Sequence, residues 1–196
     1  MIIYMFSKIC VTNRHLCNED FLQRIEKIAA SKPDAIILRE KDMDENSYEV
    51  LASQVMAICK KYSVNCILHT FIQAAIRLEA QAIHLPLNTL QMMSENEKCK
   101  FKVLGASCHS VDEAKAAQAL GCTYITAGHI FDTDCKRGLP GRGLDFLRDV
   151  CESINIPVYA IGGISKQNIE DVYRQGAKGI CMMKAYMQCE NPITII

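Results

Sequence analysis

The amino-acid sequence predicts an α/β protein, a single (β/α)₈ TIM barrel over residues 1–196, and two observations support this fold. Short apolar runs rich in β-branched residues alternate with amphipathic stretches, and no linker or low-complexity segment interrupts the alternation. The apolar runs also lack strict alternation of apolar and polar residues, which is typical of strands buried on both faces of a parallel sheet. Eight such runs in 196 residues favour a minimal barrel.

The strands follow one another at regular spacing. They are expected at residues 7–12, 35–39, 65–69, 82–85, 102–106, 123–127, 158–161 and 179–182. An open doubly wound sheet is the alternative arrangement of such units. The first strand is not followed by a Gly-x-Gly-x-x-Gly motif, so a dinucleotide-binding fold gains no support.

Helices are expected between the strands. Apolar residues recur at helical spacing in 21–29 and in 47–62. Ser110 and Glu113 have the spacing of a capping box, which opens a helix that continues to Ala119, and Gly121 stands where that helix would stop. Because the sequence ends at Ile196, the final helix is expected to be short.

Composition excludes several classes of protein. The 22 basic and 22 acidic residues balance, so neither nucleic acid nor a membrane surface is expected as a partner. No apolar run is long enough to span a membrane, and residues 1–6 are too short a segment for a secretory signal. The eleven cysteines are odd in number and form no Cys-x-x-Cys pair, so we expect reduced thiols in a cytoplasmic protein.

In a barrel, chemistry belongs to the loops that follow the strands, and the second of these loops is basic. Arg39 and Lys41 leave the second strand toward the barrel mouth, where a guanidinium and an ammonium group suit a carboxylate or phosphate. The alternative is a pair of surface cations balanced by Glu40 and Asp42.

The loops after the fifth and sixth strands carry histidines. Ser107 and His109 stand beside the start of a helix, a natural place for an anion or polar ligand, although His109 could instead help to cap that helix. The sixth strand is followed by a long, glycine-punctuated loop, 128–143, of the kind that usually binds a ligand. His129 begins it, at a position suited to proton transfer, although a structural histidine bonded to a carbonyl is the alternative.

The last two loops suit a phosphate group. Gly162 and Gly163 let backbone N–H groups approach a ligand closely, and Met183 and Lys184 follow the eighth strand. Barrels recurrently bind phosphate in these two loops, although the paired glycines are also compatible with a simple tight turn.

A metal site is not expected. His69 and His84 end the third and fourth strands without paired carboxylates beside them, whereas Mg²⁺ prefers oxygen ligands. Asp132 and Asp134 could supply two such ligands, but an acidic pair in a loop is more often simply solvated.

Taken in order, five segments resemble the thiamine phosphate synthase superfamily, and the resemblance covers nearly the whole chain. They are Arg39-Glu40-Lys41, His84-Leu85-Pro86, 105–110, 124–129 and 160–163. The loop 128–143 is most similar to the TenI-type branch, whose characterised members are thiazole tautomerases.

That resemblance implies an isomerase that converts a carboxylated thiazole phosphate to its aromatic form, with His129 as the acid/base. It also implies that Gly162, Gly163 and the loop of Met183 and Lys184 hold the phosphate, although the family has a small serine in place of Lys184. Arg39 would bind the substrate carboxylate. A phosphorylated thiazole is the expected partner, and a homodimer the expected assembly.

Two alternatives remain open. The first is thiamine phosphate synthase, a transferase that joins a pyrimidine pyrophosphate to a thiazole phosphate. In that enzyme Asn-Asp after the third strand and Gly-Gln-Glu-Asp after the fourth supply aspartates that bind Mg²⁺. Here the corresponding positions are His69-Thr70 and 86–89, which leaves Arg39, Lys41 and Lys136 to neutralise charge.

No cofactor is therefore expected, and Mg²⁺ only if the synthase alternative holds. The second alternative is a non-catalytic regulator that binds a phosphorylated ligand.

Overall fold

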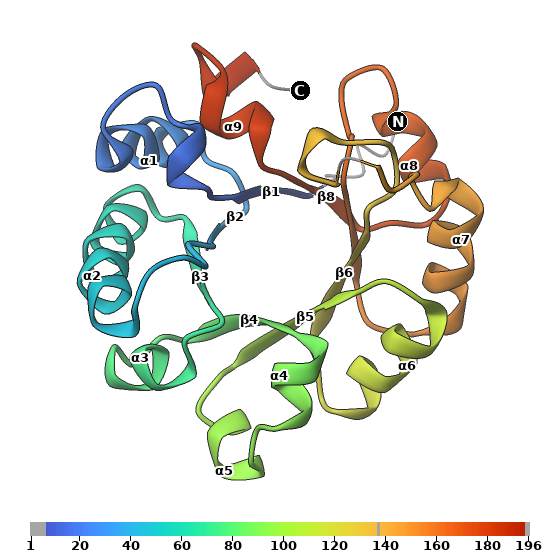
Figure 1. Ribbon diagram of the computed structural model, residues 1–196, viewed down its shortest axis with the longest axis horizontal. Helices are drawn as coiled ribbons and strands as arrows, with labels where there is room; N and C mark the ends of the chain where they lie inside the picture. Colours follow the sequence, from blue (N-terminus) through green and yellow to red (C-terminus); the bar gives the residue numbers. More distant parts are fainter. Residues whose placement is uncertain (1–6, 137, 195–196) are drawn as a thin grey trace.

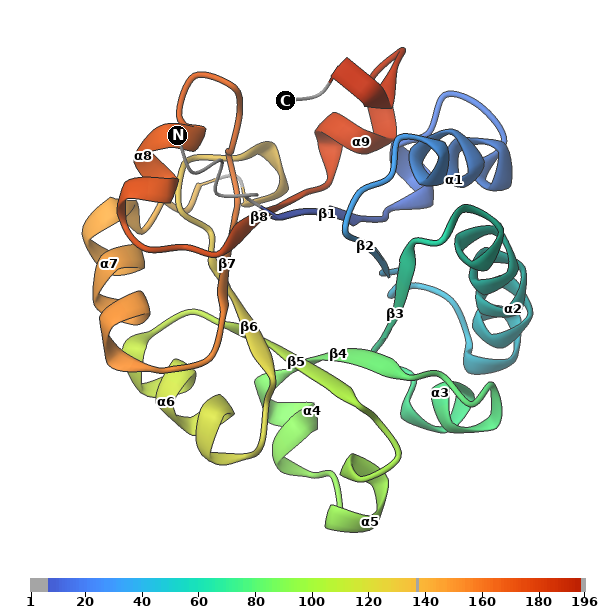
Figure 2. The same ribbon diagram turned by 180° about the vertical axis from the view of Figure 1, so that it is seen from behind.

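The fold is a closed barrel of eight parallel strands with helices packed around it (Figures 1 and 2). A computed structural model describes residues 7–136 and 138–194. Residues 1–6, a segment too short for a secretory signal, and Ile196 lie outside the described residues. Each strand pairs in parallel with its neighbours in the sequence, and β1 pairs with β8 to complete the ring. The predicted (β/α)₈ barrel is confirmed.

The strands lie close to their predicted positions. They are β1 Ser7–Val11, β2 Ala35–Leu38, β3 Asn65–His69, β4 Ala82–Pro86, β5 Val103–Cys108, β6 Tyr124–Gly128, β7 Val158–Ile161 and β8 Gly179–Met182. Differences from prediction are confined to the ends. The largest is at β5, which continues to Cys108 and so includes Ser107, because Ser107 pairs with Thr126 of β6.

The helices fill the intervals between the strands. The α-helices are α1 Phe21–Ala30, α2 Glu45–Tyr62, α3 Ile72–Arg77, α4 Leu87–Gln91, α5 Glu95–Lys98, α6 Val111–Ala119, α7 Gly143–Ser153, α8 Ile169–Arg174 and α9 Lys184–Gln188. Short 3₁₀ turns lie at η1 Arg14–Leu16, η2 Asp134–Lys136 and η3 Pro192–Thr194. The last helix, α9, has 5 residues, as short as predicted.

The core has two layers, and β1 shows how alternate residues serve both. Ile9 and Val11 belong to a cluster inside the barrel, which also contains Ile37 and Cys181. Cys10, between them, belongs to the larger cluster that joins the sheet to the helices. Several cysteines are buried in these layers as small apolar side chains. No helix in the described part of the chain is long and apolar enough to cross a membrane.

The barrel closes at the β1–β8 seam, where the two backbones approach closely. Ser7 is paired with Gly179. A methyl group at Gly179 would lie 2.2 Å from the Ser7 carbonyl oxygen, so only glycine allows this approach. Closure directs the carboxyl ends of all eight strands to one face and thereby collects the loops described next.

Candidate functional site

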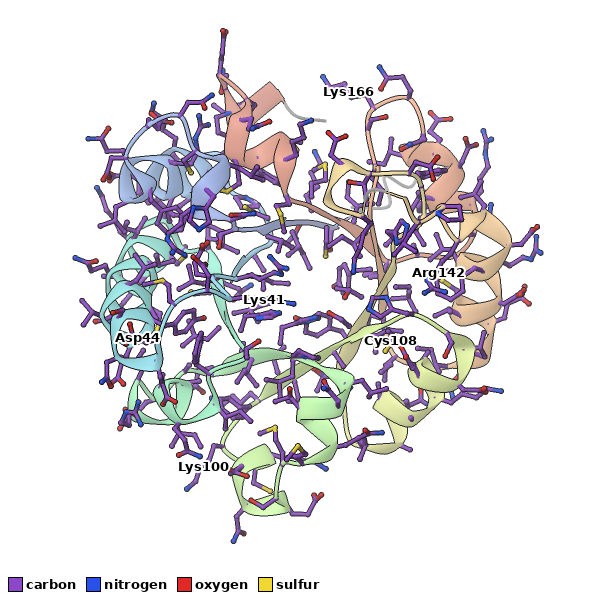
Figure 3. All side chains as sticks on the ribbon, in the orientation of Figure 1. Lys41, Asp44, Lys100, Cys108, Arg142 and Lys166 are labelled. Atoms are coloured by element: carbon purple, nitrogen blue, oxygen red, sulfur yellow. The ribbon has the colours of Figure 1, made fainter. Side chains whose placement is uncertain are left out.

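A cavity of about 1610 Å³ opens at the carboxyl ends of the strands. It brings together every residue that the sequence predicted for a site, although these residues come from five different loops. They are Arg39, Lys41, Ser107, His109, His129, Lys136, Gly162, Gly163, Met183 and Lys184. In Figure 3, Lys41 reaches over the barrel opening, whereas Lys100 and Lys166 lie at the periphery.

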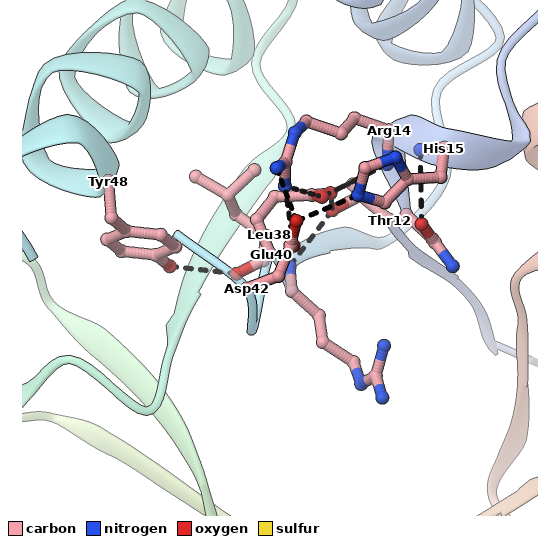
Figure 4. Close-up of polar contacts among 9 residues, drawn as sticks. Thr12, Arg14, His15, Leu38, Glu40, Asp42 and Tyr48 are labelled. Carbon is pink, nitrogen blue, oxygen red and sulfur yellow. Dashed lines mark hydrogen bonds and ion pairs between the residues drawn. The ribbon is translucent and has the colours of Figure 1, made fainter. Parts of the chain in front are cut away.

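The corner beside β2 is built on Glu40, whose carboxylate is buried (Figure 4). The Thr12 hydroxyl donates to Glu40 Oε1 at 2.7 Å, and the Arg14 backbone N–H donates to Glu40 Oε2 at 3.0 Å. The Arg14 guanidinium also donates to Glu40 at 3.2 Å. The same Thr12 hydroxyl accepts the Arg39 backbone N–H at 2.9 Å. This network fixes the end of β2 and the point from which Arg39 leaves it.

Both acids near this corner bond to the Arg14 guanidinium. Asp42 accepts the Arg14 guanidinium at 2.7 Å and lies 2.8 Å from His15 Nε2. Hydrogen bonds from Arg14 and His15 hold the pKa of Asp42 far below its ordinary value. Glu40 and Asp42 therefore share Arg14 as a partner.

Three cations converge at this side of the mouth. Partial burial lowers the pKa of Lys41, and the positive charges of Arg39 and Lys136 lower it further. Lys136 comes from η2 in the loop after β6. Like charges gathered at the mouth of one cavity favour an anion as ligand, since an anion offsets their mutual repulsion. The arrangement therefore suits a phosphate or pyrophosphate group.

Two neutral imidazoles form part of the cavity beside these cations. The rings of His69 and His84 are stacked with their centroids 5.7 Å apart. His84 bonds to the Tyr124 hydroxyl at 2.9 Å and to Ser107 Oγ at 2.8 Å, while His69 Nδ1 lies 2.6 Å from Thr70 Oγ1.

Burial keeps both rings uncharged. It is the main cause that lowers the pKa of His69 to about 2 and that of His84 to about 3. Nearby positive charge lowers both values further, from Lys41 in each case. Sequence reasoning considered these histidines only as metal ligands. A sequence signal for their place in the cavity did exist: each histidine lies near the carboxyl end of an otherwise apolar strand, and the two strands are neighbours.

His109 and its neighbours secure the rim between β5 and β6. His109 Nδ1 donates to the Gly128 carbonyl at 2.7 Å. Ser110 caps α6 by accepting the Glu113 N–H, as predicted. The Glu113 carboxylate, however, accepts the His109 N–H at 2.5 Å, so the return bond of the predicted capping box goes to the preceding residue. His109 is therefore held at both its ring and its backbone.

The loop after β6 folds back on itself. His129 Nε2 donates to the Leu139 carbonyl at 3.2 Å, and the His129 carbonyl accepts the Arg142 N–H at 3.0 Å. Asp132 accepts the Gly141 N–H at 2.7 Å. These bonds place the His129 ring at the cavity wall while engaging one of its nitrogens within the loop. His129 thus lies at the cavity, as the sequence predicted. It also bonds to a backbone carbonyl, as expected for a structural histidine.

Glycines shape the corner beside β7. Gly162 has φ +103° and Gly163 has φ +66°, a region that favours glycine. A methyl group at Gly162 would lie 2.3 Å from His129 Cβ, and one at Gly163 would lie 2.5 Å from the Asp132 carbonyl oxygen. Across the described ranges, no acceptor bonds to the Gly163 N–H, and both glycines line the cavity.

An ion pair links this corner to the loop after β6. Lys184 Nζ lies 2.7 Å from Asp134 Oδ2, and both residues line the cavity. Both side chains are more than half exposed, so the pair contributes little to stability. The pair holds the Lys184 ammonium group at the cavity, which Gly162 and Gly163 also line.

The donor set does not fit Mg²⁺, which prefers oxygen ligands. Each acid that lines the cavity is engaged elsewhere: Glu113 by His109, Asp132 by Gly141 and Asp134 by Lys184. Over residues 7–136 and 138–194, no three His, Cys, Asp or Glu side chains are grouped to hold a metal ion.

Several known proteins that are similar to this chain share one description. The family described as thiamine monophosphate synthase matches residues 9–186. The putative thiamine-phosphate synthase 2 of Aquifex aeolicus is 33% identical over 91% of this chain and 96% of its own. The thiamine-phosphate synthase of Fusobacterium nucleatum is 32% identical over 90% of this chain and 87% of its own.

A solved structure shares the fold. The thiamine phosphate pyrophosphorylase from Pyrococcus furiosus superposes with a TM-score of 0.82 at 24% identity. The match covers 97% of this chain and 91% of that one.

These findings correct the predicted activity. The expectation of an isomerase acting on a thiazole phosphate is wrong, because relatives that match nearly the whole chain are named as synthases, which are transferases. The prediction relied on the loop 128–143 and on His129 within it. The structure places His129 at the cavity, but a histidine at a strand end is compatible with several reactions and identifies none of them.

Proposed function

Because the chain belongs to the thiamine monophosphate synthase family, we propose that it is a thiamine-phosphate synthase that joins a pyrimidine pyrophosphate to a thiazole phosphate. One observation carries the proposal. A single cavity contains a cationic corner beside β2 and an amide-lined corner beside β7 and β8. Two anion sites in one cavity suit two phosphorylated substrates that must meet, whereas one site would suffice for an isomerase.

The cationic corner is assigned to the pyrophosphate. In the reaction the thiazole nitrogen forms a bond to the carbon attached to the pyrimidine ring, and the bond from that carbon to the pyrophosphate oxygen breaks. The leaving group takes the electron pair and gains negative charge. Arg39, Lys41 and Lys136 converge where that charge can be neutralised as it develops.

The amide-lined corner is assigned to the thiazole phosphate. Gly162, Gly163 and Met183 line the cavity here, and no acceptor among the described residues bonds to the Gly163 N–H. Lys184 adds an ammonium group within reach of the same corner, in place of the family's small serine. This assignment follows the recurring use of the last two barrel loops for phosphate groups.

The polar floor is assigned to the pyrimidine ring. Ser107 and His109 line the cavity beside the neutral His84, and the His84–Ser107 hydrogen bond holds the Ser107 hydroxyl in place. His129 is assigned the positioning of the β6 loop through Leu139 and Gly162. No proton transfer is assigned to it. Because the donor set does not fit Mg²⁺, no step is assigned to a metal.

The test is a coupling assay with both substrates. The purified protein is expected to release thiamine phosphate and pyrophosphate in equal amounts, measured by chromatography and by a phosphate-release assay. Lys41→Met is expected to lower turnover strongly because it removes a charge at the leaving group. Lys100→Met is the matched control, since Lys100 is an exposed lysine far from the mouth.

The decisive contrary result is binding without coupling. If the protein binds thiazole phosphate but yields no product with ample enzyme, with or without Mg²⁺, the synthase proposal fails. A regulator that binds a phosphorylated ligand would then account for the cavity.

A further inference from the structure

We propose that the cationic corner binds pyrophosphate directly, through Arg39, Lys41 and Lys136, and needs no divalent cation to do so. The inference rests on the proposed function, because it concerns the leaving group of that reaction. Enzymes that act on phosphorylated substrates often use Mg²⁺ to neutralise the negative charge of the phosphate groups, and here side-chain cations would do so instead.

The first support is the direction of the charges at this corner. Arg39 and Lys41 leave β2 on either side of Glu40, whose carboxylate is buried and turned toward Thr12 and Arg14. Lys136 approaches from the loop after β6. All three cations line the cavity, and their positive charge matches a ligand with several negative charges rather than a ligand already neutralised by a metal.

The second support comes from the ends of β3 and β4, next to the cations. A metal that bridged the pyrophosphate there would need carboxylate or other oxygen ligands. The structure instead has His69 and His84, and three of their four ring nitrogens bond to Thr70, Tyr124 and Ser107. Lys41 lies close enough to influence both rings and would repel a divalent cation.

The third support is the state of the acids that line the cavity. Asp134 is paired with Lys184, Asp132 accepts a hydrogen bond from the Gly141 backbone, and Glu113 accepts one from His109. To recruit any of them for a metal would break a contact that shapes a loop. Direct binding of the anion requires no such rearrangement.

The experiment is calorimetric titration of the protein with inorganic pyrophosphate, once in EDTA and once with Mg²⁺ in excess, at equal ionic strength. Binding in EDTA is expected to be at least as tight as in Mg²⁺, because the metal complex of pyrophosphate carries less negative charge. Lys41→Met is expected to weaken binding about tenfold, the size of one lost charge-assisted hydrogen bond. Lys100→Met is expected to change nothing.

Two outcomes would overturn the inference: binding that appears only when Mg²⁺ is present, or no binding of pyrophosphate in either buffer. Circular dichroism and thermal unfolding of the Lys41→Met protein exclude loss of the fold as the cause of its weaker binding.

The coupling assay separates this inference from the proposed function. If pyrophosphate binds in EDTA but the substrates are not joined, the synthase proposal fails and the metal-independent site stands. If the substrates are joined but pyrophosphate binds only with Mg²⁺, the synthase proposal stands and this inference fails.

Discussion

The two corners of the cavity accommodate anions by different physical means. Beside β2, long cationic side chains extend from a strand end that the buried Glu40 holds in place. Beside β7, Gly162 and Gly163 line the cavity, and the absence of their side chains lets the β6 loop pack directly against this backbone. The first corner depends on charge and is sensitive to ionic strength. The second depends on the absence of side chains at its glycines, so a single added methyl group should disrupt it.

The largest effect is expected from Glu40→Ala, which removes the anchor of the β2 corner. The substitution leaves the Thr12 hydroxyl and the Arg14 N–H without their buried acceptor, and each such unsatisfied donor costs about 1–3 kcal/mol. Chemical unfolding should show this loss, and pyrophosphate affinity should fall while phosphate-monoester affinity is retained. Glu95→Ala is the control, because the Glu95 side chain is 83% exposed. Equal losses of both affinities would show that the corners are not independent.

Gly162→Ala tests the second corner. Gly121→Ala provides the reference, since Gly121 also has a left-handed backbone, φ +90°, but open space around it. The reference should lose about 1–2 kcal/mol from the backbone alone. Gly162→Ala should lose a further 1–3 kcal/mol or so, because its methyl group would overlap His129. Phosphate-monoester binding should be lost with pyrophosphate binding retained. Similar free energies of unfolding for the two variants would mean that the loops of Gly162 and His129 can move apart without loss of stability.

Acid pH tests the imidazoles that lie beneath the mouth. The pKa of His84 is about 3 in the folded protein, below the ordinary value near 6.5, so the unfolded chain binds more protons between these values. The contribution of the neutral His84 ring to the free energy of unfolding should therefore be fully present above pH 6.5. It should fall as the pH drops below that value. The slope due to this ring is about 1.4 kcal/mol per pH unit. Chemical unfolding of His84→Gln across that window should show a shallower slope, and an unchanged slope would exclude His84 as its source.

The smallest effect is expected from Lys184→Ser, which removes the exposed ion pair between the β8 and β6 loops. Its loss should change the free energy of unfolding by less than about 1 kcal/mol. Phosphate-monoester affinity should fall modestly, and high salt should reduce the difference from the parent protein. Lys166→Ser serves as control, because Lys166 lies at the periphery of the molecule in Figure 3. A gain in affinity would indicate that Lys184 obstructs the corner.

The sequence predicted the barrel and its loops because both follow from local patterns. Apolar runs mark buried strands, and parallel strands of a closed barrel bring all their carboxyl ends together, so residues as distant as Arg39 and Lys184 meet in one cavity. The same reasoning could not reveal which partners each side chain selects. Glu40 turns toward Arg14, and Glu113 bonds to His109, through contacts that depend on three-dimensional placement.

The reaction class was the part that local patterns misjudged. A single loop around His129 resembled one branch of the family, whereas the similarity that matters extends over residues 9–186. The neutral state of His69 and His84 was likewise beyond sequence reasoning, because it results from burial among residues of other strands.

The seam between Ser7 and Gly179 has a consequence for synthesis on the ribosome. The first strand of the barrel is the partner of its last, so β1 exposes an unpaired edge until β8 has been translated. Nascent chains stalled before residue 179 should bind chaperones and resist compaction, and release should be followed by rapid burial of that edge.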